Sequence, residues 1–172
     1  RQRQMCIRDR LTTLVMLQGK IEKKPENVAT LLASVEETVS ESLEASGITL
    51  YIDCRMESLV MDFDLMRSAL VNLIDNARKA SESGTVINLR AYENIIEVND
   101  QGKGIPPHEI ARIAEPFYMV DRSRSKKSGG SGLGLTLVKR IAEAHGTKLQ
   151  ISSTIGAGTT CRLMFMPIDV DK

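Results

Sequence analysis

The sequence predicts an α/β fold, a two-layer sandwich in which about three helices cover one face of a mixed β-sheet. Helical and strand patterns follow one another in the order helix, two strands, helix, two strands, loop, helix, two strands. Each expected helix has a single apolar side, as helices that pack on one layer of strands do. Strictly alternating strand–helix–strand units are absent, which disfavours a doubly wound nucleotide fold.

The elements expected in the first half are a helix over residues 28–45, strands over 48–52 and 59–61, and a helix from Asp62 or Asp64 to about Ser81. The first helix has apolar residues at intervals of three and four, and Gly47 ends it. The second helix repeats this spacing, while the two short runs between them are rich in residues that favour strands.

The elements expected in the second half are strands over residues 86–92 and 95–98, a glycine turn over 100–104, a short helix from Pro106, a helix over 133–144 and strands over 148–152 and 159–164. Residues 117–131 lack apolar periodicity and are rich in Ser, Gly, Arg and Lys. They are therefore expected to form a mobile loop.

The composition fits one domain with a short extension. The chain has 172 residues, of which 42% are hydrophobic and 26% charged. Its net charge of +1 gives no electrostatic case for nucleic acid, and the absence of Trp disfavours base stacking. Three cysteines without a C-x-x-C pair are expected to be free thiols of a cytosolic protein. No apolar run approaches the roughly 20 residues that span a bilayer.

Three stretches are expected along the chain. Residues 1–10 are set aside, because Met5–Arg10 match the translation of a common sequencing adapter; a genuine basic helix end is the alternative. Residues 11–25 are expected to be a helix remnant and a linker, since helical spacing gives way to Gly19 and Pro25. Residues 26–168 are expected to form the folded domain. A chain that begins with Arg1 is expected to be a piece of a longer protein.

Four motifs carry candidate chemistry. The first places Asn72, Asn76 and Lys79 at i, i+4 and i+7, on one face of a helix. Asparagine offers a neutral oxygen that suits Mg²⁺ when phosphate oxygens share the ion, and lysine adds a positive charge. A solvated polar edge of an amphipathic helix explains the same spacing.

The second motif is Asp100-Gln101-Gly102-Lys103-Gly104, directly after a strand. A carboxylate there can accept the exocyclic amine of adenine, and the glycines let backbone approach the ring. A plain glycine turn is the alternative. The fourth motif, Gly156-Ala157-Gly158-Thr159, is a turn that places a hydroxyl near a purine, or simply a turn.

The third motif, Gly129-Gly130-Ser131-Gly132-Leu133-Gly134, lies directly before a helix. Free amides at a helix start favour a bound phosphate, and a flexible hinge is the alternative. A dinucleotide fingerprint is disfavoured, because no apolar strand leads into this loop. The Walker sequence G-x-x-x-x-G-K-[ST] is absent.

Together the four motifs resemble, in order and spacing, those of the Bergerat ATP-binding (GHKL) superfamily, which includes DNA gyrase, heat-shock chaperones, mismatch-repair ATPases and histidine kinases. Between the second and third motifs, Glu115–Arg124 resembles the phenylalanine box and ATP lid of sensor histidine kinases. The similarity covers about residues 28–167, and residues 11–24 resemble the end of the dimerisation helix that precedes this domain.

The resemblance implies the Bergerat fold and a site for ATP and Mg²⁺. At the adenine end, Asp100 would bind the N6 amine, Gly102, Gly104 and Ile105 would shape the pocket, and Thr159 would lie near the ring, directly or through water.

At the phosphate end, the resemblance implies that Asn76 coordinates Mg²⁺, that Asn72 lies beside the phosphates and that Lys79 contacts them. The residues that it assigns to the lid and its hinges are Phe117, Arg124, Gly130, Gly132, Leu133 and Gly134, with Lys126 or Lys127 as further candidates. Arg124 would reach the γ-phosphate, whereas Phe117 would anchor the lid or meet the dimerisation helices, or simply pack in the core.

The residue at position 72 distinguishes the histidine kinases of this superfamily from its hydrolysing members and serine kinases. Hydrolysing members and anti-sigma-factor serine kinases carry a glutamate as general base four residues before the Mg²⁺-binding asparagine, where this chain has Asn72. An asparagine cannot take a proton at neutral pH, so a histidine kinase is favoured over an anti-sigma serine kinase. A non-catalytic nucleotide-binding scaffold, the other alternative, predicts degraded motifs. Asn72, Lys79 and Arg124 are thus the candidate catalytic residues.

The resemblance also implies partners. The phosphorylated histidine would lie on an upstream dimerisation domain, because neither His108 in a loop nor His145 at a helix end fits that role. His145 is expected to cap or to pack. A response regulator would be the further partner, the domain would be cytoplasmic and monomeric in a parent protein that missing segments anchor in the membrane, and nucleic acid is not expected to bind.

Overall fold

The computed structural model describes residues 21–115, 118 and 132–166. Its helices are α2 (Val28–Glu44), α3 (Phe63–Ala80), α4 (Pro107–Ile110) and α6 (Gly134–His145). Its strands are β1 (Lys24–Asn27), β2 (Thr49–Cys54), β3 (Ser58–Met61), β4 (Val86–Tyr92), β5 (Ile95–Asn99), β6 (Lys148–Thr154) and β7 (Gly158–Met164). The expected helix remnant at 11–17 and most of the expected loop at 117–131 lie outside the described residues.

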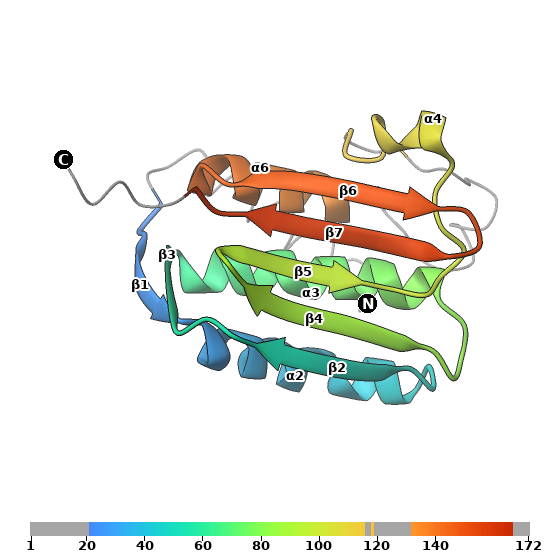
Figure 1. The fold of residues 1–172 in the computed structure, drawn as a ribbon, viewed down its shortest axis with the longest axis horizontal. Helices are drawn as coiled ribbons and strands as arrows, with labels where there is room; N and C mark the ends of the chain where they lie inside the picture. The colour runs from blue at the N-terminus through green and yellow to red at the C-terminus, as the bar shows by residue number, and fades with distance from the viewer. Residues whose placement is uncertain (1–20, 116–117, 119–131, 167–172) are drawn as a thin grey trace, which may run out of the picture.

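The main sheet has five strands in the order β2-β4-β5-β7-β6 (Figure 1). β2 runs parallel to β4, and the other neighbouring pairs are antiparallel. The sheet is therefore mixed, as predicted. Glu93 and Asn94 connect β4 to β5 with positive φ values of 45° and 62°, the left-handed conformation that a tight hairpin turn needs.

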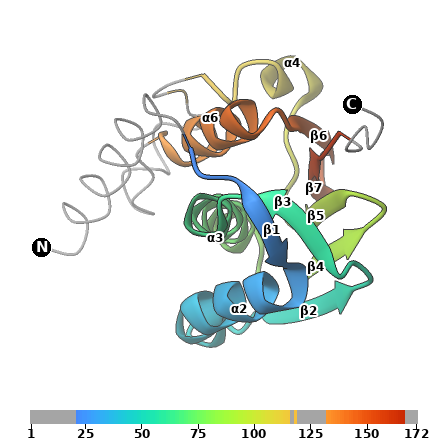
Figure 2. The ribbon, with the colours of Figure 1, turned by 90° about the vertical axis from the view of Figure 1, so that its left-hand side faces the viewer.

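The long helices α2, α3 and α6 all lie on one side of the sheet (Figure 2), which confirms the predicted two-layer sandwich. Their apolar sides meet alternate residues of the strands, so that Ile87, Leu89 and Ala91 of β4 are fully buried. Buried residues of α2, α3, α6 and the strands form a single hydrophobic cluster. None of the helices among the described residues has the length and apolar character that crossing a bilayer requires.

Helix ends are fixed by specific contacts. The side chain of Asp62 accepts a hydrogen bond from the Leu65 amide and caps the start of α3. Nε2 of His145, at the end of α6, accepts a hydrogen bond from the Asp62 amide at 3.0 Å, while Nδ1 lies 2.7 Å from the Ile141 carbonyl. The predicted packing role of His145 is confirmed, and this ring joins the end of α6 to the start of α3.

Strand β1 was not predicted, because the sequence suggested a linker up to Pro25. It pairs antiparallel with β3 in a separate two-stranded sheet, so β3 does not belong to the main sheet. Pro25 is tolerated in such a peripheral strand, where its missing amide interrupts no central ladder. Asn27 then caps α2 by accepting a hydrogen bond from the Thr30 amide.

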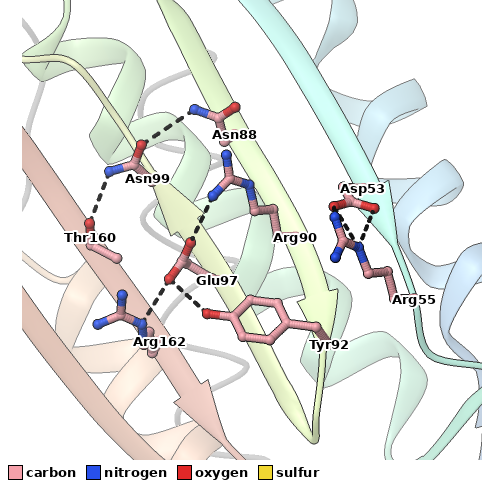
Figure 3. A network of polar contacts seen from close by, with 9 residues as sticks. All are labelled: Asp53, Arg55, Asn88, Arg90, Tyr92, Glu97, Asn99, Thr160 and Arg162. Carbon is pink, nitrogen blue, oxygen red and sulfur yellow. Dashed lines mark hydrogen bonds and ion pairs between the residues drawn. The ribbon is translucent and has the colours of Figure 1, made fainter.

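The sheet face opposite the helices carries an ordered polar network (Figure 3). Asp53, Arg90, Glu97 and Arg162 are register neighbours on four adjacent strands, so charge alternates across the sheet. Glu97 is only 4% exposed and accepts hydrogen bonds from Arg162 at 2.7 Å and from the Tyr92 hydroxyl at 3.1 Å. A slip of one residue in register would break this ladder, so it helps to specify the strand alignment.

Candidate functional site

A cavity of about 240 Å³ opens on the helix side of the sheet. Its described lining residues are Leu73, Asn76, Ala77, Lys79, Ala80, Val98, Asp100, Ile105, Ile113, Tyr118, Gly132, Gly134, Leu135, Ile151, Thr159 and Cys161. They come from α3, from three neighbouring strands, from the segment that includes α4 and from the start of α6. A largely apolar hollow with a few polar groups is typical of a small-molecule site.

Three apolar strand residues contribute to the wall of the cavity. Val98 on β5 is the register partner of Cys161 on β7, which is in turn the partner of Ile151 on β6. Burial raises the pKa of the Cys161 thiol to about 12, so this cysteine stays protonated and behaves as a small apolar residue. The three side chains together give the cavity an apolar wall against which a ring can lie.

Asp100 is the only carboxylate among the described residues that line the cavity. It follows β5 and is 6% exposed. Its Oδ1 accepts hydrogen bonds from the amides of Gly102, at 2.8 Å, and Thr159, at 3.2 Å. Burial raises the pKa of Asp100, and these two amides oppose the shift. Since both amides bind Oδ1, Oδ2 is left as an acceptor for a ligand.

The glycines of the second and fourth motifs bring backbone segments together. A Cβ on Gly102 would lie 2.6 Å from the Ala80 carbonyl oxygen, and one on Gly104 would lie 2.1 Å from that of Thr154. A Cβ on Gly158 would lie 1.9 Å from the Asp100 carbonyl oxygen. Neither Gly102 nor Gly104 lines the cavity. They shape the pocket indirectly, by letting the turn after Asp100 pack against the end of α3 and the β6–β7 turn.

The polar residues of α3 lie at different depths. Asn76 and Lys79 line the cavity, and Nζ of Lys79 lies 2.7 Å from Oδ2 of Asp75. Asp75 also binds Arg78 at 2.8 Å. Burial alone would raise the pKa of Asp75, but the hydrogen bonds from Lys79 and Arg78 outweigh it and lower this pKa. Asp75 therefore stays charged and holds the ammonium of Lys79 at the cavity.

Asn72 does not line the cavity, and it is buried, with an exposed fraction of 6%. Its Nδ2 donates to the Ser68 carbonyl at 2.7 Å, and its Oδ1 is buried without a hydrogen-bond partner. Such an unpaired acceptor is unusual in a folded protein and indicates a missing donor or ion.

The start of α6 provides the fourth side of the cavity. Gly132 and Gly134 line it, while Leu133 is buried, at 3% exposure, and does not line it. Leu133 stands at the N-cap without a capping side chain. Within the described residues no side chain caps the first amides of α6, so they are candidates to bind an anion, which the helix dipole also favours.

Tyr118 is a lining residue that sequence reasoning did not assign. Its hydroxyl donates to Glu109, which raises the pKa of Tyr118, and the Arg112 guanidinium lies 4.3 Å from the centre of its ring. Glu109 and Arg112 thus hold this aromatic side chain at the cavity by a hydrogen bond and a cation–π contact.

Seven predicted site residues line the cavity: Asn76, Lys79, Asp100, Ile105, Gly132, Gly134 and Thr159. Asn72, Gly102, Gly104 and Leu133 do not. Phe117, Arg124, Lys126, Lys127 and Gly130 lie outside the described residues.

The apolar lining residues were missed as a site, although two signals point to them. Leu73, Ala77 and Ala80 share a face of α3 at i, i+4 and i+7, adjacent to Asn76. Strand alternation places Val98, Ile151 and Cys161 on the inner face, but their contact depends on sheet register, which local patterns do not give.

The donor set limits how a metal can bind. No group of three or more His, Cys, Asp or Glu side chains suitable for a metal exists within the described part of the chain. Asn76 supplies one neutral amide oxygen, so a hard cation here would need most of its ligands from water and from a bound anion.

Residues 61–170 match the sequence profile described as histidine kinase-, DNA gyrase B-, and HSP90-like ATPase. The chain is 32% identical over 145 residues to the sensor protein SrrB of Staphylococcus aureus, covering 81% of this chain and 25% of that protein. It is 33% identical over 148 residues to the circadian input-output histidine kinase CikA of Synechococcus elongatus, covering 81% and 20%. The chain thus spans a quarter or less of these curated relatives.

Solved structures show the same fold. Full-length ShkA in complex with AMPPNP superimposes with a TM-score of 0.75 at 24% identity, over 90% of this chain and 34% of that one. The mycobacterial sensor histidine kinase MprB superimposes with a TM-score of 0.68 at 24% identity, over 82% and 95%.

Proposed function

Because this chain belongs to the histidine kinase-, DNA gyrase B- and HSP90-like ATPase family, and to its histidine kinase type, we propose that it transfers the γ-phosphate of ATP to a histidine. The ATP would be bound with Mg²⁺, and the histidine would lie on a dimerisation domain outside this chain. One observation carries the proposal: the described lining of the cavity combines one buried carboxylate with an asparagine, a lysine and the start of α6. We assign the carboxylate to a base end and the other groups to a phosphate end.

The carboxylate end suits adenine. Oδ2 of Asp100 accepts a hydrogen bond from the N6 amine, because Oδ1 is occupied by two backbone amides. The apolar surface of Val98, Ile151 and Cys161 supports the purine ring. An apolar wall beside the carboxylate of Asp100 favours a purine that carries an amino group.

The other end suits a magnesium triphosphate. The amides at the start of α6 bind phosphate oxygens, and Lys79 adds its charge while Asp75 holds it. Asn76 would coordinate Mg²⁺. Asn72, one turn earlier on α3, would lie beside the phosphates, behind the described lining of the cavity. Bound Mg²⁺ would neutralise charge that develops on the transferred phosphoryl group. Arg124 remains the candidate contact to the γ-phosphate.

The lining favours transfer to an imidazole over hydrolysis. Asp100 is the only carboxylate among the described lining residues, and it is assigned to binding the adenine, so it does not serve as a general base. Water and serine hydroxyls need a general base, whereas an imidazole is itself a nucleophile. The protein's contribution to the reaction is then positioning and charge neutralisation.

The partners follow from this chemistry. His145 is buried between α6 and α3, and His108 is an exposed residue of α4, so the acceptor histidine is assigned to a separate dimerisation domain.

A response regulator would take the phosphoryl group onward. The domain would work in the cytoplasm, where ATP is available, as a monomer attached to a longer sensor protein that is anchored in the membrane. The domain proper would span about residues 26–168, after the end of a dimerisation helix, with β1 beginning two residues earlier, at Lys24.

The proposal is tested by calorimetric titration with Mg·ATP and by transfer from radiolabelled ATP to a supplied histidine-bearing dimerisation domain. We expect Asn76→Asp to lower the transfer rate at least about tenfold, since a carboxylate repels the triphosphate that the amide tolerates. Asn94→Asp, the same change in an exposed turn, is the control. Labelling of serine or threonine, or full activity of Asn76→Asp, would contradict the assignment.

A further inference from the structure

Ser153 on β6 lies directly behind the base end of the cavity. It does not line the cavity, but its hydroxyl contacts three groups, two of which belong to residues that do. Its Oγ accepts a hydrogen bond from the Ile105 amide at 2.8 Å and lies 2.8 Å from the Gly158 carbonyl oxygen. It also lies 2.9 Å from Oγ1 of Thr159. Ile105 and Thr159 both line the cavity.

The direction of these bonds follows from counting protons. A serine hydroxyl has one proton to donate and two lone pairs to accept with. The Gly158 carbonyl can only accept, so at 2.8 Å it takes the Ser153 proton. The Ile105 amide can only donate and occupies one lone pair. The second lone pair remains for Thr159, which must therefore donate its proton to Ser153.

This arrangement decides what Thr159 offers a ligand. A threonine hydroxyl has a single proton, and here Ser153 takes it, so the oxygen can only accept further bonds. Oδ2 of Asp100 is an acceptor as well. The described side-chain oxygens at the base end are thus both acceptors, although a free threonine hydroxyl would donate as readily as accept.

We propose that Ser153 is a positioning residue that sets the base specificity of the site: by taking the Thr159 proton, it makes this end select a 6-amino purine over a 6-oxo purine. An amino group donates two protons to two acceptors. A carbonyl oxygen at the same place meets two acceptors and no donor, which leaves buried polar groups unpaired. This inference rests on the proposed ATP-binding function and deepens it.

A purely structural role for Ser153 makes a different prediction. Its bonds to Ile105 and Gly158 also hold the turn after Asp100 against the β6–β7 turn. Loss of that support would weaken binding of every nucleotide by the same factor. The ratio of affinities for two bases therefore separates the two roles, whereas a single affinity does not.

The experiment compares ATP with inosine triphosphate, which replaces the 6-amino group by a carbonyl and the N1 acceptor by an N1–H donor. Dissociation constants are measured by calorimetry on the full chain and on Ser153→Ala, which frees the Thr159 proton to point into the cavity. We expect the preference for ATP to fall about tenfold, the equivalent of one hydrogen bond. Ser152→Ala removes a hydroxyl from the same strand at an exposed position and is expected to keep the wild-type ratio.

Two further variants test whether Ser153 acts through Thr159. Thr159→Val should lower the preference for ATP by itself, and adding Ser153→Ala to it should change the ratio no further. Ser153→Thr keeps a hydroxyl and should restore the ratio. If Ser153→Ala does not fold, Thr159→Val still decides, because an unchanged ratio there overturns the inference.

The outcomes separate the two proposals. A wild-type chain that binds neither nucleotide refutes the proposed function. A wild-type chain that prefers ATP, together with a Ser153→Ala variant that loses affinity for both nucleotides equally, leaves the function standing and refutes the role of Ser153.

Discussion

At the residue scale, Asp100 combines two roles that are separable by chemistry. Oδ1 joins two turns of the backbone through the amides of Gly102 and Thr159, and Oδ2 is the acceptor that we propose for the ligand. An asparagine can keep the first role, because its Oδ1 accepts the same two bonds, but it presents an NH₂ donor where the carboxylate presents an acceptor.

We therefore expect Asp100→Asn to keep the fold and lose the nucleotide. Burial raises the pKa of Asp100, so the folded state disfavours its charged form and loses stability as pH rises through that raised pKa. An asparagine does not ionise, so the variant does not lose this stability. Its melting temperature at pH 7 should therefore equal or exceed that of the wild type. ATP affinity should fall at least about tenfold. Thermal unfolding measures the melting temperature, and calorimetry measures the ATP affinity. An unchanged ATP affinity would show that Asp100 does not bind the nucleotide.

A second residue-scale prediction concerns His145. Burial lowers its pKa and outweighs the opposing effects of the Ile141 carbonyl and of Asp62, while the charge of Lys23 lowers it further. The folded state thus holds a neutral ring whose Nε2 accepts the Asp62 amide, whereas the unfolded chain takes up a proton near pH 6.5. The contribution of the neutral His145 ring to the free energy of unfolding is therefore fully present above about pH 6.5. It is lost as the pH falls towards the lowered pKa of His145 in the folded state.

Urea unfolding at pH 7.5 and 5.5 measures the effect. We expect His145→Gln to show a smaller loss of unfolding free energy on acidification than the wild type. His108→Gln is the matched control, since the His108 side chain is 80% exposed, and it should keep the wild-type pH dependence. An equal pH dependence in all three proteins would show that His145 does not titrate in this range.

At the element scale, the glycine turns after β5 and between β6 and β7 depend on close packing of backbone. Gly104 has a φ of +71° and faces the Thr154 carbonyl, and Gly156 has a φ of +77° with open space around its missing side chain. The two positions share the strained backbone and differ only in what a side chain would meet.

We expect Gly104→Ala to lower the free energy of unfolding by more than Gly156→Ala does. The left-handed backbone alone costs about 1–2 kcal/mol for alanine, which both variants share. Gly104→Ala adds a collision between Cβ and a carbonyl oxygen at 2.1 Å, which forces the turn apart. Denaturant titrations of the two variants measure the difference in their free energies of unfolding. Equal decreases in the two variants would show that the turn accommodates the Cβ without a further loss of stability.

Sequence patterns predicted most elements, because these are local. The expected helix at 28–45 is α2 (Val28–Glu44), and the expected strands at 86–92 and 95–98 are β4 and β5 to within a residue. β1 was missed because its strand character comes from pairing with β3, more than thirty residues away in the sequence. Short peripheral strands depend on such contacts more than on propensity.

The site was predicted less completely than the fold. Spacing predicted Asn76, Lys79 and Asp100, which line the cavity, because polar residues after a strand or along one helix face are visible locally. It did not find Ser153, whose role depends on bonds to Ile105 and Thr159 across three segments. Proximity of this kind is set by the register of β6 on β7, which no motif encodes.

At the scale of the whole molecule, the hydrophobic core extends beyond the segment that the family profile covers. That segment begins at residue 61, yet Leu31 and Val35 of α2 are fully buried in the same cluster as α3 and the sheet. β2, which forms one edge of the sheet, also precedes it. The stable unit therefore includes these N-terminal elements.

A fragment of residues 61–170 should accordingly fail to fold, while a fragment of residues 21–168 should unfold cooperatively. The shorter piece exposes the apolar sides of α3 and β4 that α2 and β2 cover, which removes several large buried side chains. Circular dichroism during heating, together with amide chemical-shift dispersion, checks this. A cooperative transition of the shorter fragment would place the folding boundary at residue 61.

The bonds that Oδ1 of Asp100 accepts have an evolutionary consequence. Selection for a soluble, long-lived protein acts on this oxygen even where selection for signalling has ended. If the proposed phosphate transfer is lost in a descendant, it should thus retain aspartate or asparagine here while Asn76 and Lys79 drift. An intact residue at this position is then a poor indicator of an active enzyme, and divergence along α3 is the better mark of a lineage that has abandoned catalysis.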